Sequence, residues 1–339
     1  MTISHFSIEY DAINHQNTFT NGDTIKGRII VVASKETKIQ TLTLIAKGKG
    51  EAHSSDEDST FSVNEKYYTI RQEILGEARQ DAGFHEARVG SIAQGRNVFP
   101  FSFKIPDRDM PSSIKSSLCR IVHKLKAELK QSMKLPKKAD TYFTFVSKPA
   151  VAIPGLMTPQ HGCKQTSINL GSGTVSMDVH TDKMGYKQGE ALHIRIEILN
   201  QSTRLVTPTV MFFRKETSFG NGYQSIAEKK LLQMEAQPVA SGRTETVIKR
   251  IPIPRRLPPS VLNCCMFTLE YKLKVYLDIK YKIDQGVIIP IVVLPGIQEQ
   301  PTPAACEGEA SGNPYRPTRS STPQSLEPPP SYEALYPSK

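Results

Sequence analysis

The feature that most constrains the fold of this chain is a strict alternation of apolar and polar side chains. Between 267 and 279 every second residue is large and apolar, and the pattern recurs at 192–198 and 99–105. A period of two places alternate side chains on opposite faces of a strand, so one face can pack on a core. Further segments with strand character are 4–10, 25–33, 39–50, 65–75, 119–131, 140–146, 174–180, 205–218, 226–235, 243–251 and 286–294.

So many strands, with almost no helical segment, predict an all-β protein made of two antiparallel β-sandwiches. The length of 339 residues is consistent with two domains of about 100–200 residues each. We find no apolar run that approaches the roughly 20 residues needed to span a bilayer. The first residues show no secretory signal, and five cysteines without regular spacing do not predict a disulfide framework. These features together favour a reduced, cytosolic protein.

One segment, 118–133, fits two structures. Its apolar residues also form a helical stripe with lysines opposite, which would make a basic amphipathic helix at a membrane surface. An internal repeat favours a strand instead. The sequence IPDRDMPSSI at 105–114 recurs as IPRRLPPSVL at 253–262, and the same spacing aligns 124–126 with 272–274. Because the second copy clearly alternates, we expect a strand in the first and two related sandwiches.

Composition sets the domain limits. Prolines and glycines interrupt the pattern between 149 and 166, so we expect an N-terminal sandwich at 1–148, a linker at 149–166 and a C-terminal sandwich at 167–295. The remaining residues, 296–339, contain nine prolines and only three large aliphatic residues. Such a segment cannot bury enough apolar surface to offset its ordering entropy, so we expect a disordered, proline-rich tail.

The net charge of +10 is unevenly distributed along the chain. The tail has five acidic and three basic residues, which leaves +12 for residues 1–295. Lys124, Lys126 and Lys130 form a dense basic cluster, and alternation places them on the solvent face, opposite Leu125 and Leu129. They could contact an anionic membrane surface or an acidic partner. The alternative is an ordinary soluble, lysine-rich face, and we expect no nucleic-acid partner.

The sequence contains no pattern that predicts catalysis. There is no G-x-S-x-G, H-E-x-x-H, Walker A or complete G-x-G-x-x-G motif. His161 and Cys163 are the one close His/Cys pair, and two ligands do not make a zinc site. Cys264 and Cys265 are adjacent at the expected start of a strand, so one should be buried and the other exposed. We therefore expect a non-enzymatic protein with no catalytic residues, no metal and no cofactor.

Several short motifs, in order along the chain, resemble one family. They are Phe6-x-Ile8-x-Tyr10, FTNGDTIKG at 19–27, GYKQGE at 185–190, ILNQS at 198–202, SGRTET at 241–246 and PPSVLNC at 258–264. Together they resemble the arrestin domain-containing proteins, the α-arrestins, over roughly residues 1–295. The resemblance implies two arrestin-type β-sandwiches and an adaptor role in membrane-protein trafficking. Relatives often carry two PPxY motifs, whereas this tail has one.

That motif is Pro329-Pro330-Ser331-Tyr332. Prolines favour a polyproline II conformation, which fits the aromatic groove of a WW domain, and Tyr332 can fill a second pocket. The resemblance implies that the WW domains belong to a HECT-type ubiquitin ligase. A chance match in a proline-rich tail is the alternative. Tyr332 and Leu335 also fit a Tyr-x-x-hydrophobic sorting signal.

We therefore expect a cytosolic adaptor that is recruited to the plasma membrane and endosomes. Its sandwiches would bind a membrane-protein cargo or receptor tail, with peripheral membrane contact, and its tail would bring the ligase to promote cargo ubiquitination, endocytosis and endosomal sorting. Proximity is the mechanism, because the tail raises the ligase's effective concentration near the cargo. The alternative is a redox-signalling interaction protein linked to thioredoxin, which rests on analogy to one family relative.

Overall fold

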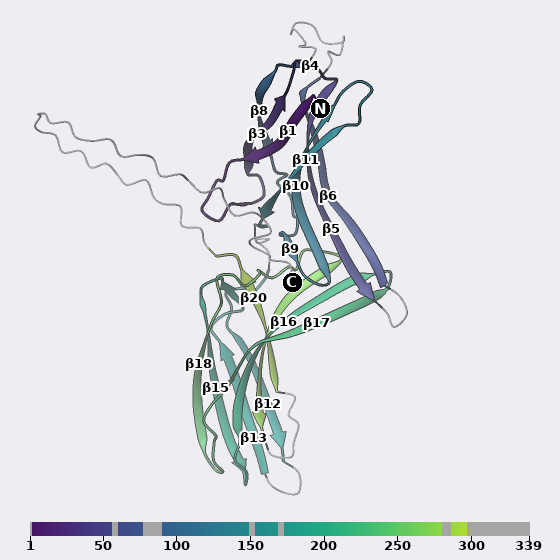
Figure 1. The fold of residues 1–339 in the computed structure, drawn as a ribbon. Coiled ribbons are helices and arrows are strands. Elements are labelled where there is room, and N and C mark those ends of the chain that lie inside the picture. Colours follow the sequence, from purple (N-terminus) through teal and green to yellow (C-terminus); the bar gives the residue numbers. More distant parts are fainter. Residues whose placement is uncertain are drawn as a thin grey trace, which may run out of the picture.

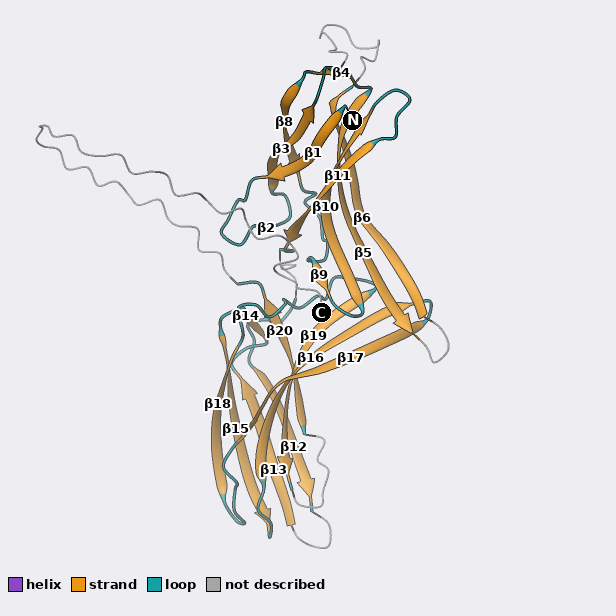
Figure 2. Ribbon diagram, viewed as in Figure 1, coloured by secondary structure: helices purple, strands orange, loops and turns teal. Residues whose placement is uncertain are grey.

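The computed structural model describes residues 2–55, 60–76, 90–148, 153–168, 173–279 and 286–296. In these ranges the chain forms strands, turns and loops without a helix (Figure 2). The strands form two sandwiches placed end to end (Figure 1). The prediction of two antiparallel β-sandwiches is therefore confirmed.

The N-terminal sandwich has one three-stranded sheet in the order β1-β3-β8 and one larger sheet in the order β2-β11-β10-β5-β6, with β9 paired to β10. The pairs are antiparallel, apart from the short parallel pair β2–β11. The strands are β1 (Ile3–Tyr10), β2 (Thr18–Phe19), β3 (Thr24–Ala33), β4 (Thr37–Lys38), β5 (Thr41–Ser55), β6 (Thr60–Leu75), β7 (Ser91–Ile92), β8 (Gly95–Lys104), β9 (Ile114–Lys115), β10 (Cys119–Lys130) and β11 (Lys137–Phe145). Alternate residues of both sheets, such as Ile29, Phe101, Leu125 and Phe143, meet in one core.

The C-terminal sandwich pairs a sheet in the order β12-β13-β15-β18 with one in the order β14-β20-β19-β16-β17. The strands are β12 (Gln160–Ser167), β13 (Gly173–Thr181), β14 (Gly185–Lys187), β15 (Ala191–Ser202), β16 (Thr207–Gly220), β17 (Tyr223–Glu235), β18 (Thr244–Pro252), β19 (Phe267–Asp278) and β20 (Val287–Leu294). The alternating residues of β15 and β19 point inward and supply much of the core.

The two sandwiches share buried surface. Ala52, Ile114, Cys119 and Ile121 of the N-terminal half pack into the C-terminal core. Side chains also bond across the junction: Asn263 Nδ2 donates to Asp109 Oδ1 at 2.6 Å, and Ser54 Oγ donates to the Gly220 carbonyl at 3.4 Å. Figure 1 shows the ends of β5 and β6 lying against β16 and β17. Apolar burial and direct hydrogen bonds thus fix the two halves against each other.

The motif at 19–27 has a structural basis. Gly22 has φ of +79°, in the left-handed region, within a turn where the Asp23 carboxylate accepts the Thr20 N–H at 2.8 Å. A Cβ on Gly27 would lie 2.3 Å from the Glu9 carbonyl oxygen and 2.6 Å from the Phe101 ring. Close packing of β1, β3 and β8 therefore requires glycine at this position.

Two expectations from sequence were decided by the strand assignments. Residues 119–130 form strand β10 and not a helix, as the internal repeat predicted. Strand β12 occupies the second half of the segment assigned to the linker, so the linker ends before Gln160. The sequence hid β12 because it is a polar edge strand in which only Thr166 is buried.

Candidate interaction surfaces

The lysine cluster lies on the outer face of β10, as alternation predicted. Leu125, Ala127 and Leu129 are fully buried behind it. Lys124 Nζ is 3.7 Å from Asp140 Oδ2 and 5.8 Å from the centroid of the Tyr142 ring. Lys126 Nζ donates to Glu128 Oε2 at 3.3 Å. Exposed surface is only 20% of the Lys124 side chain and 18% of Lys126, whereas Lys130 is exposed.

These contacts divide the cluster in two. The charges of Lys124 and Lys126 are balanced within the sheet by Asp140 and Glu128. Partial burial would raise the pKa of Glu128, but the Lys126 hydrogen bond and the charges of Lys126, Lys138 and Lys130 lower it below its usual value. Among the described residues, Lys130 and Lys138, at the end of the strand pair, form no ion pair of their own, although both lie within reach of the Glu128 charge.

Three thiols and a tyrosine meet at the domain junction. The Tyr67 hydroxyl is 3.6 Å from Cys264 Sγ, and Cys265 Sγ donates to Glu65 Oε2 at 3.3 Å. Burial, with Cys264 and Glu216 nearby, raises the pKa of Cys119, and burial with the Glu65 hydrogen bond raises that of Cys265. Because the thiolate is the nucleophile, this environment disfavours thiol reactivity.

Cys264 is buried and Cys265 exposed, as predicted, but both precede β19, which begins at Phe267.

His161 and Cys163 are brought close to two further polar side chains that sequence spacing did not reveal. The antiparallel register places His161 opposite His180 and Cys163 opposite Asp178. The two histidine rings stack at 4.5 Å, and His161 Nε2 is 3.1 Å from Asp178 Oδ1. Within the described ranges, no three His, Cys, Asp or Glu side chains are arranged to hold a metal ion. The residues form an exposed polar cluster on a sheet face.

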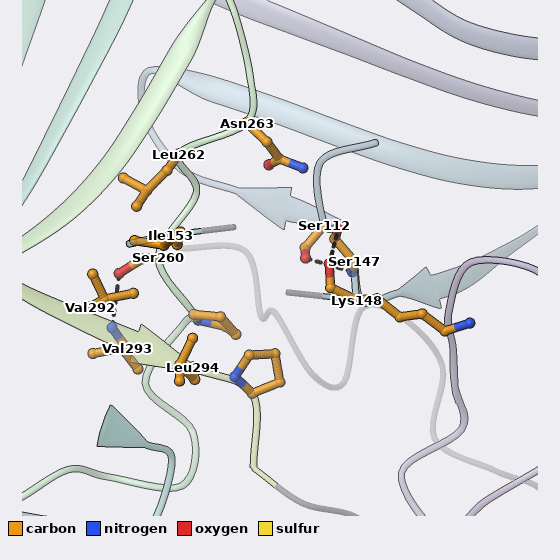
Figure 3. Close-up of a pocket in the computed structure, with 12 residues that line it drawn as sticks. Ser112, Ser147, Lys148, Ile153, Ser260, Leu262, Asn263, Val292, Val293 and Leu294 are labelled. Atoms are coloured by element: carbon orange, nitrogen blue, oxygen red, sulfur yellow. Dashed lines mark hydrogen bonds between the residues drawn. The ribbon is translucent and has the colours of Figure 1, made fainter. Parts of the chain in front are cut away.

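A small cavity lies where the domains and the start of the tail meet (Figure 3). Its volume is about 140 Å³, below the range of about 300–1,000 Å³ typical of small-molecule sites. Its serines are already engaged, since Ser112 Oγ accepts the Ser147 N–H at 2.9 Å and Ser260 Oγ accepts the Val293 N–H at 3.0 Å.

The candidate tail sites lie outside the described residues. This applies to Pro329, Pro330, Ser331 and Tyr332, and to Leu335 of the sorting signal. Among the residues with described structure, none belongs to a helix long and apolar enough to cross a membrane.

The described residues form two tandem β-sandwiches that share a buried junction, which defines the two-sandwich class of fold. Residues 6–152 match the family model for the arrestin (or S-antigen) N-terminal domain, and residues 171–297 match the model for the C-terminal domain. The chain therefore belongs to the arrestin family, within its α-arrestin branch. Family members are non-enzymatic adaptors.

Individual relatives agree. The chain is 26% identical over 289 residues to arrestin domain-containing protein 4 of Mus musculus, which covers 81% of this chain and 68% of that protein. The Homo sapiens protein of the same name is 26% identical over 288 residues, with the same coverage. Thioredoxin-interacting protein of Mus musculus is 21% identical over 282 residues, covering 82% of this chain and 70% of that protein.

Proposed function

We propose that this protein is a cytosolic adaptor that binds a membrane-protein cargo with its sandwiches and a WW-domain HECT-type ubiquitin ligase with its tail. The observation that carries the proposal is the Pro329-Pro330-Ser331-Tyr332 motif behind two arrestin domains. A chance PPxY match carries little weight alone. Behind an adaptor body it supplies the second binding site that an adaptor requires.

The mechanism is proximity. The body has a packed junction and would present the cargo-binding surface, while the tail composition predicts a flexible tether. A ligase held by such a tether has a high effective concentration near cargo lysines, without a catalytic group on the adaptor. The resulting cargo ubiquitination would direct endocytosis and endosomal sorting. The protein would then move from the cytosol to the plasma membrane and endosomes, with peripheral membrane contact through its basic surface.

The test is binding of the full-length protein to isolated WW domains by isothermal titration. We expect binding by the wild type and none by Tyr332→Ala, because the second pocket loses its side chain. Tyr315→Ala is the matched control, since Tyr315 lies in the same tail without a preceding proline pair. Equal affinity of the Tyr332→Ala and wild-type proteins would refute the motif assignment.

The redox alternative is supported by relatives named thioredoxin-interacting protein. The raised pKa values of Cys119 and Cys265 weigh against it, since both thiols stay protonated. Capture of thioredoxin that disappears with reductant and with a single cysteine substitution would favour this alternative.

A further inference from the structure

The connection between β10 and β11, residues 131–136, is here called the distal loop. It contains Met133, which is fully exposed, and Leu135, which is 91% exposed. These are the two most exposed large apolar side chains in the described ranges, and they lie two residues apart. Exposed apolar residues are ordinary when scattered singly. Two of them close together on one loop expose apolar surface to water, which is unfavourable and often marks an interaction site.

The loop is anchored at its base, and the side chains of Met133 and Leu135 stay exposed at its tip. Gln131 is buried and its Nε2 donates to Thr37 Oγ1 at 3.0 Å, while Gln40 N donates to the Lys130 carbonyl at 2.9 Å. Met133 has φ of +54°, a region that non-glycine residues rarely occupy. Its side chain gains no burial in return for this conformation. Figure 1 shows the loop beside the N-terminus, at the end of the sandwich far from the C-terminal domain.

Lysines surround the two apolar residues. Lys130, Lys134, Lys137 and Lys138 flank them in sequence. Lys134 Nζ donates to Thr2 Oγ1 at 3.3 Å and Lys137 Nζ to the Ile3 carbonyl at 2.5 Å, so their partners are neutral. Within the described part of the chain, none of these four lysines forms an ion pair with a carboxylate, unlike Lys124 and Lys126.

We propose that the distal loop inserts Met133 and Leu135 into the interface of an anionic lipid bilayer, with the flanking lysines on the headgroups. An apolar tip flanked by lysines that form no ion pair among the described residues matches the two layers of such a surface, acyl chains below and negative charge above. The inference deepens the peripheral membrane contact in the proposed function and rests on it. It does not depend on the PPxY motif.

Flotation of the full-length protein with phosphatidylcholine vesicles, with and without phosphatidylserine, tests the proposal. We expect wild-type binding to require phosphatidylserine and to fall about ten-fold in the Met133→Ser, Leu135→Ser double variant, which is about 1.4 kcal/mol. Ile248→Ser is the matched control, because Ile248 is 75% exposed on β18 in the other domain. Lys134→Glu with Lys138→Glu should also weaken binding, and Lys229→Glu with Lys230→Glu should do so much less.

A second measurement locates the contact directly. The chain has no tryptophan, so Leu135→Trp introduces a single reporter that keeps the tip apolar. We expect its emission to shift to shorter wavelength with phosphatidylserine vesicles and to be quenched by brominated lipid. The control Ile248→Trp should show neither effect.

The outcomes separate the loop from the broader proposal. If the wild type floats but the loop variants float equally well and Leu135→Trp is not quenched, the membrane contact stands and the distal loop is not its site. If the wild type does not float with any vesicle, the loop insertion and the peripheral contact are both rejected. In either case the adaptor role is measured independently through WW binding.

Discussion

A buried histidine in the N-terminal core should make this protein lose stability in mild acid. His123 of β10 is 1% exposed, and its Nδ1 lies 3.2 Å from the Tyr68 hydroxyl. Its ring stacks on Phe145 with centroids 4.5 Å apart. Burial lowers the pKa of His123 to about 4, and the Pro111 carbonyl opposes this only partly, since Nε2 does not reach hydrogen-bonding geometry with any partner.

The sign and size follow from linkage. The folded state keeps His123 neutral, while the unfolded chain takes up a proton below a pKa of about 6.5. The unfolded state therefore binds more protons, and stability present above pH 6.5 is lost as the pH falls toward 4. At about 1.36 kcal/mol per unit of pH, this residue alone should remove about 2 kcal/mol between pH 7 and pH 5.

The assay is urea unfolding followed by far-ultraviolet circular dichroism at several pH values. His123→Phe keeps an aromatic ring against Phe145 and removes the titration, so its stability should fall by about 2 kcal/mol less over this range than that of the wild type. Carboxylates titrate in both proteins and cancel in the difference. His193→Phe, at an exposed position on β15, controls for the loss of one histidine. A constant difference between wild type and His123→Phe from pH 7 to pH 5 would refute the reasoning.

Three further predictions concern the fold and the tail. Gly27→Ala should destabilise the protein by about 1–3 kcal/mol in urea unfolding, because the new methyl group meets backbone atoms of β1 that cannot move aside. A chain that ends at Gly296 should keep the thermal midpoint of the full protein, since the removed residues have little apolar surface to bury; a lowered midpoint would mean that the tail packs on a sandwich. Phosphorylation of Tyr332 in a tail peptide should weaken WW binding in titration calorimetry, because a phosphate is costly in a largely apolar pocket.

Period two in the sequence was enough to predict the two sandwiches, because the inward positions of β15 and β19 are uniformly large and apolar. It failed at β12, where an edge strand buries almost nothing and leaves no alternation to detect. Very short strands, such as the two-residue pair β4 and β7, also gave no alternation in the sequence. They are too short for a period to appear, and only their pairing with a distant segment defines them as strands.

Surface features were harder to predict than core features. Alternation gave the outward direction of Lys124 and Lys126, but their pairing with Asp140 and Glu128 depends on cross-strand register and rotamers. The exposure of Met133 and Leu135 was also missed, although both lie beyond the last alternating residue of the strand and Leu135 directly precedes Pro136. An apolar residue that falls outside the core pattern, in a lysine-rich turn, is the signal that could have identified the distal loop.

The division of the lysines into paired and unpaired sets leads to a final prediction about where charge acts. Lys124→Gln with Lys126→Gln, and Lys134→Gln with Lys138→Gln, remove the same net charge from the same end of the molecule. The first pair leaves Asp140 and Glu128 without their partners, so a negative charge appears on the sheet face, farther from the tip than Lys134. The Lys124 and Lys126 pairs are partly buried, so their loss should cost more than the roughly 0–1 kcal/mol of an exposed ion pair, and urea unfolding checks that both variants remain folded.

If lipid contact is made edge-on by the distal loop, the Lys134, Lys138 variant should lose more binding to phosphatidylserine vesicles than the Lys124, Lys126 variant. The Lys124, Lys126 variant should lose less because those lysines lie farther from the loop, and charge is screened over a Debye length of about 8 Å at physiological salt. The difference should shrink at low salt, where screening is weaker and each charge acts over a longer distance. Equal losses at physiological salt would show that the whole β10 face contacts lipid, with the protein lying flat and not on its tip.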